Sequence, residues 1–555
     1  MRLIATSTLT LVEYVGSNVP PYGILSHTWE DEEATYQDML SGLASGKKGY
    51  AKIDMVCKKA ANDGLEHVWV DTCCIDKTSS AELSEAINSM FQWYEDSDIC
   101  YVYLSDLDPS TDMSSTLSHC RWFTRGWTLQ ELLAPATIKF FDRDWVFRGT
   151  EKDLSPQLSQ ITSISIAVLG HRAKLYSVPV AVRMSWAARR QTTKVEDLSY
   201  CLMGIFNINM PLIYGEGARA FRRLQEEIVK SNRDLSIFAW RAASNQASPD
   251  PCEYSGVFAA SPRNFIDCQQ ITRSREAHSY AGFLVTNLGI QMAARLLYRS
   301  SDDSKGGGYI LRLDCSSGPE SGESIGILLR KYGPDLYLRY QPARLFTIKR
   351  DIGSYYKART IYMPLELPNL GWERGMPWSR RIIDNRVSAI QICLPPGFTP
   401  YDAAPVSHRD VHDSVFFSTE STHDGWCALV MEGELCIGGD DFEVSLLFIC
   451  FGWNNRPGHI FSTLADISIC DPIKVSQLNE TLGHEDECVI PWALTELGYF
   501  GIPVQKSVLL TGSSGNTIEF SYVANKCMEP DICKNEMLRI QIVWKEVGKA
   551  PIQGT

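Results

Sequence analysis

The sequence predicts an α/β fold with a parallel sheet and a helical extension, followed by a β-rich, sandwich-like second domain. Up to Trp240, apolar strand-like runs first alternate with helical patterns, and from Val178 onward helical patterns dominate. Beyond a polar stretch, nearly every readable segment is a short apolar run bounded by Gly, Pro, Asn or Asp. We therefore place the first domain at residues 1–240, a linker at 241–252 and the second domain at 253–555.

The first domain is expected to open in the order β-α-β-α-β-α-β. Its strand-like runs cover residues 22–29, 65–76, 99–106 and 136–145. Helical patterns lie between them at residues 50–64, 79–98 and 128–135. The first helix would bury Ile53, Val56 and Ala60 on one face. The second would begin with a capping box formed by Ser79 and Glu82.

The helical extension should contain helices at residues 179–191, 192–206 and 216–232. Thr193 and Glu196 have the spacing of a capping box, which would open the second of these helices. In the second domain, strands are expected at 307–315, 324–332, 335–342, 388–396, 426–432, 442–453 and 536–544.

Charge and cysteine content narrow the class of protein. A formal net charge of −13 and a pI near 5.4 argue against a nucleic-acid partner, which would require clustered basic residues. The 17 cysteines are odd in number and several lie in apolar runs, as expected for reduced thiols in an intracellular protein. The first residues lack a secretory apolar core, and no apolar run reaches the ~18 residues of a membrane span. The sequence thus predicts a cytoplasmic protein without a membrane span.

Polar and aromatic side chains gather where the predicted strands end. Ligands of an open parallel sheet bind outside the carboxyl ends of the strands, so these side chains should share one edge. They are Ser26, His27 and Trp29 after the first strand, Asp71 and Asp76 after the second, and Ser105, Asp106, Arg121, Arg125, Trp127 and Glu131 after the third.

Structural roles for the same residues remain open at this point. The segment TLQE, from Thr128 to Glu131, has the pattern of a capping box, in which Glu131 would only bond the start of its helix. Asp71 could be a helix cap, Trp127 a core residue and His27 a histidine hydrogen-bonded at the sheet edge.

Five segments resemble, in order, the fungal heterokaryon incompatibility (HET) domain: ILSHTWEDEEATYQDM, VWVDTCCIDK, RWFTRGWTLQELLAP, MSWAARRQTTKVEDLSYCLMGIFNINMPLIYGEGARAFRRLQEEI and DLSIFAW. They cover roughly residues 20–240, and the fourth is highly specific. The resemblance implies a fungal cytosolic protein whose HET domain triggers cell death when incompatible strains fuse. One departure is Glu30, where the family pattern leads us to expect glycine, a residue used where φ is positive.

The HET domain is in turn similar to the TIR domain in the order of its elements, which implies a TIR-like sheet. The segment RGWTLQEL resembles the TIR segment that carries the catalytic glutamate of NAD-cleaving members, and this places Glu131 at that position. NAD would then be the substrate, with no further cofactor and no metal.

The hypothesis of an NAD-cleaving enzyme gives other residues roles around the substrate. Trp29 or Trp127 would stack on the nicotinamide, and Arg125 would pair with the diphosphate. The remaining residues of the binding site would be Ser26, His27, Asp71 and Asp76.

A hypothesis from a different class fits the sequence as well. In it the HET domain is a signalling module that self-associates when the second domain senses an unidentified protein partner, and death follows from recruitment without chemistry.

Overall fold

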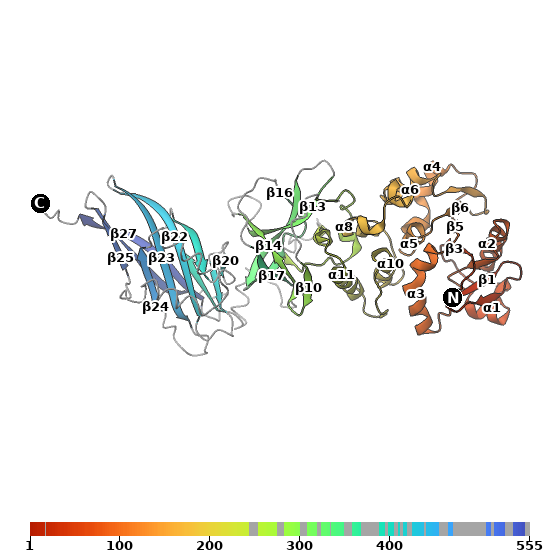
Figure 1. Ribbon diagram of the computed structural model, residues 1–555, viewed down its shortest axis with the longest axis horizontal. Coiled ribbons are helices and arrows are strands. Elements are labelled where there is room, and N and C mark those ends of the chain that lie inside the picture. Colours follow the sequence, from red (N-terminus) through yellow and green to blue (C-terminus); the bar gives the residue numbers. More distant parts are fainter. Residues whose placement is uncertain are drawn as a thin grey trace. The chain divides into compact units, whose positions relative to one another are not determined.

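The structure is a computed structural model in two compact units, which are described separately here (Figure 1). One unit comprises Met1–Leu297, Ile310–Leu328 and Arg339–Arg359, and the other Tyr298–Tyr309, Leu329–Leu338 and Thr360–Thr555. The residues that the structure describes are 1–16, 18–243, 254–274, 282–299, 308–318, 323–333, 335–348, 358–367, 388–394, 398–404, 409–410, 415–418, 425–437, 440–453, 464–469, 507–511, 516–527 and 537–549.

Four parallel strands form the centre of the first sheet, as the sequence predicts. They are β3 (Gly23–His27), β4 (His67–Trp69), β5 (Ile99–Tyr103) and β6 (Ile138–Phe141), in the spatial order β4-β3-β5-β6. All five residues of β3 are buried, because helices cover both faces of such a sheet. The connection from β3 leads to β4 on one side, and the connection from β4 crosses to β5 on the other side.

Three further strands make the sheet mixed and seven-stranded, in the order β2-β1-β4-β3-β5-β6-β7. The hairpin of β1 (Arg2–Ala5) and β2 (Leu11–Glu13) pairs antiparallel with β4, and β7 (Phe147–Thr150) pairs antiparallel with β6. The expectation of a parallel sheet alone therefore missed these antiparallel edges. Strands of three or four residues are too short to show a clear alternation of apolar and polar residues, so the sequence did not predict them.

Two of the predicted helices flank the parallel strands. In α2 (Tyr50–Asn62), Ile53, Val56 and Ala60 are buried as predicted, and the chain turns at Gly64 with φ of 84°. In α3 (Ser80–Glu95), the Ser79 hydroxyl accepts from the backbone of Glu82 as expected. The Glu82 carboxylate instead accepts from Asp76 N at 2.7 Å, so the second half of this capping box does not form.

The helix that carries Glu131 is α5 (Thr128–Leu133), all of whose residues are buried. Its first residue is Thr128, and its N-cap, Trp127, makes no side-chain cap. The Thr128 hydroxyl donates to the carbonyl oxygens of Trp122 (2.5 Å) and Arg125 (3.0 Å). The interpretation of TLQE as a capping box is therefore wrong, because Thr128 lies inside the helix and its hydroxyl faces preceding carbonyls.

The helical extension contains α8 (Val180–Ser185), α9 (Asp197–Tyr200), α10 (Met203–Phe206) and α11 (Arg219–Ser231). The predicted helix at 192–206 is thus two short helices. Glu196 does not form the expected capping box with Thr193, because its carboxylate accepts from Gly215 N (2.8 Å) and Gly217 N (3.0 Å). The remaining short helices are α1 (Tyr36–Ser41), α4 (Met113–Thr116), α6 (Ser155–Thr162) and α7 (Ile166–Leu169).

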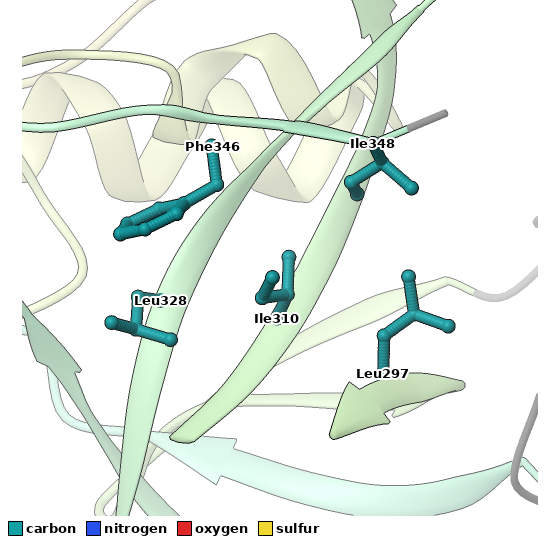
Figure 2. Packing of buried hydrophobic residues seen from close by; sticks show 5 residues of the cluster. All are labelled: Leu297, Ile310, Leu328, Phe346 and Ile348. Carbon is teal, nitrogen blue, oxygen red and sulfur yellow. The ribbon is translucent and has the colours of Figure 1, made fainter. Parts of the chain in front are cut away.

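Further strands follow the helices along the chain. Antiparallel pairs join β10 to β11, β13 to β9, β14 to β16 and β15 to β8. Figure 2 shows a buried cluster of Leu297, Ile310, Leu328, Phe346 and Ile348 among these strands. The strands are β8 (Tyr254–Ser255), β9 (Thr272–Arg273), β10 (Phe283–Thr286), β11 (Gly289–Ala294), β12 (Leu296–Arg299), β13 (Gly308–Ser316), β14 (Ser324–Gly333), β15 (Leu336–Tyr340), β16 (Phe346–Ile348) and β17 (Arg359–Met363).

Buried hydrogen bonds join this β region to the helical extension. Trp240 Nε1 donates to Val257 O (2.9 Å), and the Gln225 side chain bonds both backbone groups of Ala259. The Arg339 guanidinium, fully buried, donates to the carbonyls of Phe238 and Trp240 and lies 3.8 Å from the Trp240 ring. Residues 244–252 of the predicted linker lie outside the described residues, and the domain boundary stays a prediction.

The second unit is β-rich, as predicted. One sheet has the order β20-β21-β18-β27-β26-β25 and another the order β19-β22-β23-β24. The rings of Phe398 and Phe520, one from each sheet, contact each other at 5.6 Å. The strands are β18 (Ser388–Cys393), β19 (Phe398–Ala404), β20 (Arg409–Asp410), β21 (Val415–Ser418), β22 (Gly425–Ile437), β23 (Asp440–Trp453), β24 (Leu464–Ile469), β25 (Ser507–Thr511), β26 (Asn516–Cys527) and β27 (Met537–Lys549).

Two expectations about the chain as a whole can be compared with the described residues. Among these residues, no helix combines the length and the apolar character needed to cross a bilayer. The described cysteines include nine free thiols, and all of these except Cys393 are buried. Burial raises the pKa of the Cys57 thiol to about 12, which makes it chemically inert.

Gly204 of α10 provides a test of the packing between α10 and α3. A Cβ at Gly204 would lie 2.1 Å from Cβ of Phe91, so Gly204→Ala should destabilise the protein by about 1–3 kcal/mol. Helix propensity alone predicts the opposite sign, a gain of about 1 kcal/mol. Denaturant unfolding measures the difference, with Gly46→Ala as the control because nothing lies within 4 Å of its added Cβ. Equal stability of Gly204→Ala and wild type would contradict this packing.

Candidate functional site

The carboxyl end of β3 is where the sheet topology places a ligand site. β4 and β5 pair with β3 on opposite sides, which makes this strand the switch point of the parallel sheet. Ser26 and His27 are the last two residues of β3, and both are buried. Two of the predicted site residues therefore lie at the strand end where open parallel sheets bind their ligands.

A buried chain of hydrogen bonds joins α5 to this strand. The Ser26 hydroxyl donates to the Glu131 carboxylate and accepts from Trp122 Nε1 at 2.7 Å. Glu131 is 7% exposed, and Ser26 and Trp122 are fully buried. The sequence places Ser26 and Glu131 at the same sheet edge, and the structure brings them into direct contact.

The surroundings of Glu131 favour its protonated form. Burial raises the pKa of Glu131 to about 8; the hydrogen bond from Ser26 opposes this shift, and the charge of Asp71 adds to it. The cations of Arg125 and Arg190 lower the same pKa more weakly. At neutral pH this carboxyl group is therefore largely neutral, and a positive charge placed nearby would ionise it.

Trp29 organises a second group of predicted residues. Its Nε1 donates to Asp71 Oδ2 at 2.8 Å, and the residue is 43% exposed. The guanidinium carbon of Arg125 lies 6.0 Å from the ring centroid, and Lys77 Nζ lies 3.6 Å from it. The charges of Asp71 and Arg125 shift the pKa of Glu131 in opposite directions, so this group is electrostatically coupled to the buried carboxyl.

His27 is a buried, neutral imidazole. Its side chain is 1% exposed, and neither ring nitrogen has a hydrogen-bond partner in the described part of the chain. Burial lowers the pKa of His27 to about 3; Asp71 opposes the shift, and Lys52, Arg125 and Lys77 add to it. The alternative that His27 is a hydrogen-bonded histidine is therefore wrong, although Nε2 lies 3.9 Å from Glu33.

Two predicted site residues have partners elsewhere. The Asp76 carboxylate accepts from Gln37 Nε2 (2.7 Å) and from the backbone and hydroxyl of Thr78, which stabilises the turn before α3. Trp127 directs its Nε1 to Asp197 Oδ2 in α9, at 3.4 Å. In the described part of the chain, neither side chain bonds to Ser26, Glu131 or Trp29.

The loop after β3 accommodates the unexpected Glu30. The positive φ of this loop falls at Glu32, at 59°. The Glu30 carboxylate accepts from Arg121 Nη2 (2.9 Å) and from the Ser105 hydroxyl (2.8 Å). Asp106 accepts from Arg121 N at 2.8 Å. Three residues predicted at this edge thus form an exposed polar network with Glu30.

Sequence reasoning missed Arg190 and Lys77. Arg190 is buried and donates to Arg125 O and to the Thr128 hydroxyl, each at 2.8 Å. Burial lowers its pKa to about 10. Arg190 lies within the most specific family-like segment, but no spacing rule relates it to Glu131.

Gly126 allows the segment of Arg190 to approach the start of α5. Gly126 N donates to Gln191 O at 2.8 Å, and Gln191 N donates to Thr124 O at 2.7 Å. A Cβ at Gly126 would lie 2.5 Å from Thr192 Cγ2. A larger residue would therefore push this segment, with Arg190, away from Thr128.

Comparison with known proteins identifies the domain that holds these residues. The model of the family described as "Heterokaryon incompatibility protein (HET)" matches residues 22–117. The chain carries a HET domain. Residues 219–292 match a second family, described as a domain of unknown function, DUF8212. The HET match contains Ser26, His27, Trp29 and Asp71 and ends before Glu131.

A characterised relative extends the likeness. Over 230 residues the HET domain protein is 46% identical to "Vegetative incompatibility protein HET-E-1" of Podospora anserina. The alignment covers 39% of this chain and 17% of the relative, so the chain spans a small part of the length of that protein.

The raised pKa of Glu131 predicts how stability depends on pH. A carboxyl group whose folded-state pKa of about 8 exceeds its ordinary value stabilises the fold at low pH, and this stability is lost as pH rises toward 8. Glu131→Gln stays neutral, so its stability relative to wild type should rise between pH 5 and pH 8, by at most about 1.4 kcal/mol per pH unit. Denaturant unfolding across this range measures the change.

The matched control is Glu151→Gln. Glu151 is also buried, but it accepts from the backbone of Ile138, the first residue of β6, at the opposite end of the sheet. A pH dependence of Glu131→Gln identical to that of wild type would show that Glu131 is ionised throughout.

Proposed function

We propose that this HET domain acts in the fungal cytoplasm as a cell-death effector of incompatibility and that it does so by cleaving NAD. The observation that carries the proposal is the buried carboxyl group of Glu131, hydrogen-bonded to Ser26 at the switch point of the sheet. The name of the relative from Podospora anserina supports the incompatibility role. The TIR-like character expected from the sequence is part of the same proposal.

The chemistry needs one carboxylate in a dry site. The bond between nicotinamide and ribose breaks with its electron pair on the ring nitrogen, water adds to the ribose carbon, and a proton is released. Positive charge develops on the ribose as the bond breaks, and an ionised Glu131 stabilises it. Substrate NAD carries a cationic ring, which would lower the pKa of Glu131 from about 8 and ionise it where it is needed.

The other residues of the site have roles in binding. The indole of Trp29, oriented by Asp71, offers a ring on which the nicotinamide can stack. Arg125 has no carboxylate within ion-pair distance among the described residues, so it is free to pair with the diphosphate. The neutral imidazole of His27 supplies an unpaired donor and acceptor at the same edge.

A specific surface feature favours the second candidate, a module that signals by self-association. β7 forms one edge of the seven-stranded sheet, and Val146 and Phe147 at its start are 50% and 51% exposed. An exposed edge with apolar side chains can pair with a strand of a second copy. In this reading the HET domain assembles and recruits a protein partner.

The deciding experiment is nicotinamide release from NAD by the purified full-length chain at high concentration. Glu131→Gln keeps the shape of the side chain and removes its charge, so release should fall by orders of magnitude while the thermal midpoint at pH 7 does not fall. Glu151→Gln, the matched buried glutamate, should retain release. Wild type and Glu151→Gln, which release nicotinamide, should cause cell death on expression, and Glu131→Gln should not.

Two results would redirect the assignment. If Glu131→Gln releases nicotinamide and kills cells like wild type, Glu131 is not catalytic. If wild type releases none, and Phe147→Lys alone abolishes death and self-association, the HET domain signals by assembly.

A further inference from the structure

The ring of Trp29 is already occupied by a cation. Lys77 Nζ lies 3.6 Å from the ring centroid, well within the range of a cation–π contact. The indole cannot turn freely away from this contact, because its Nε1 is bonded to Asp71. One face of the indole is therefore covered by a side chain of the same domain.

Lys77 has little else to bind. Among the described residues it has no carboxylate within ion-pair distance, although burial of the ammonium group lowers its pKa. Its loop lies between β4 and α3, and the neighbouring side chain of Asp76 is bound to Thr78 and Gln37. The ammonium group is thus held mainly by the ring of Trp29 and by the more distant charge of Asp71.

We propose that Lys77 is an internal competitor for the face of Trp29, which a ligand bearing a cationic aromatic ring must displace. This inference rests on the proposed function, since it identifies the oxidised nicotinamide ring as the group that takes the place of the lysine.

The chemistry of the exchange explains why a cation is required. Displacing Lys77 removes one cation–π contact, and only a positively charged ring restores it; a neutral dihydronicotinamide offers stacking alone. The released ammonium group returns to solvent. Lys77 therefore weakens the binding of every ligand that stacks on Trp29, and it does not affect a ligand without the ring.

The test measures Kd by titration calorimetry in full-length protein carrying Glu131→Gln, so that NAD is not consumed. The probes are NAD, its reduced form, and ADP-ribose, which lacks the ring. Adding Lys77→Met should tighten the binding of NAD by roughly 2- to 30-fold, the strength of one cation–π contact, and should leave the Kd of ADP-ribose unchanged. In the parent protein, NAD should bind more tightly than its reduced form.

Two controls isolate the contact. Lys58→Met removes an exposed lysine that pairs with Asp54 on α2 and should change none of the three affinities. In protein that also carries Trp29→Leu, Lys77→Met should no longer lower the Kd of NAD, because the ring for which the lysine and the ligand compete has been removed.

The remaining outcomes overturn the inference in different ways. If Lys77→Met weakens NAD and ADP-ribose alike, Lys77 is a phosphate anchor; if it changes neither, the lysine does not compete. These results leave the proposed function standing. If the parent binds no probe and wild type releases no nicotinamide, the proposed function fails, and this inference fails with it.

Discussion

The hydrogen bond from Ser26 to Glu131 is the interaction on which the candidate site depends. It joins the end of β3 to α5 across more than a hundred residues of sequence, in a region from which water is excluded. A carboxyl group in such a place is costly unless it is protonated or well bonded. Trp122 completes the chain by donating to the same hydroxyl, so Ser26 is fixed from two sides.

A second layer holds α5 in position for this contact. The Thr128 hydroxyl bonds two preceding carbonyls and accepts from Arg190, whose guanidinium also bonds Arg125 O. Because Arg190 comes from the helical extension, the position of Glu131 depends on residues some sixty positions further along the chain. The extension thus supports the site through Arg190.

The sequence predicted features that follow from a periodic pattern of apolar residues. It did not predict features that depend on contacts between distant segments. Alternating apolar runs located the parallel strands, and the strand-end rule brought Ser26, His27, Trp29, Asp71, Arg125 and Glu131 to one edge. The capping-box pattern of Thr128 and Glu131 gave a wrong interpretation. The pattern alone cannot show whether Thr128 is the N-cap or the first residue of the helix. Lys77 and Arg190 were not predicted as site residues, because contacts with an aromatic face or with a backbone carbonyl do not produce a recognisable sequence spacing.

The buried Arg339 has a consequence for how this protein can be recombined. Its guanidinium bonds the carbonyls of Phe238 and Trp240, while Trp240 and Gln225 bond the backbone of Val257 and Ala259. A genetic crossover near residue 240 would join helices from one parent to strands from another. The buried side-chain donors on each side of the junction would then face backbone carbonyls in a segment with which they did not evolve. The match to a second family over residues 219–292 spans this same point. An exchange that keeps these bonds must therefore carry the last helix, the strands that follow it and Arg339 together, and a point near residue 240 is a poor place to splice.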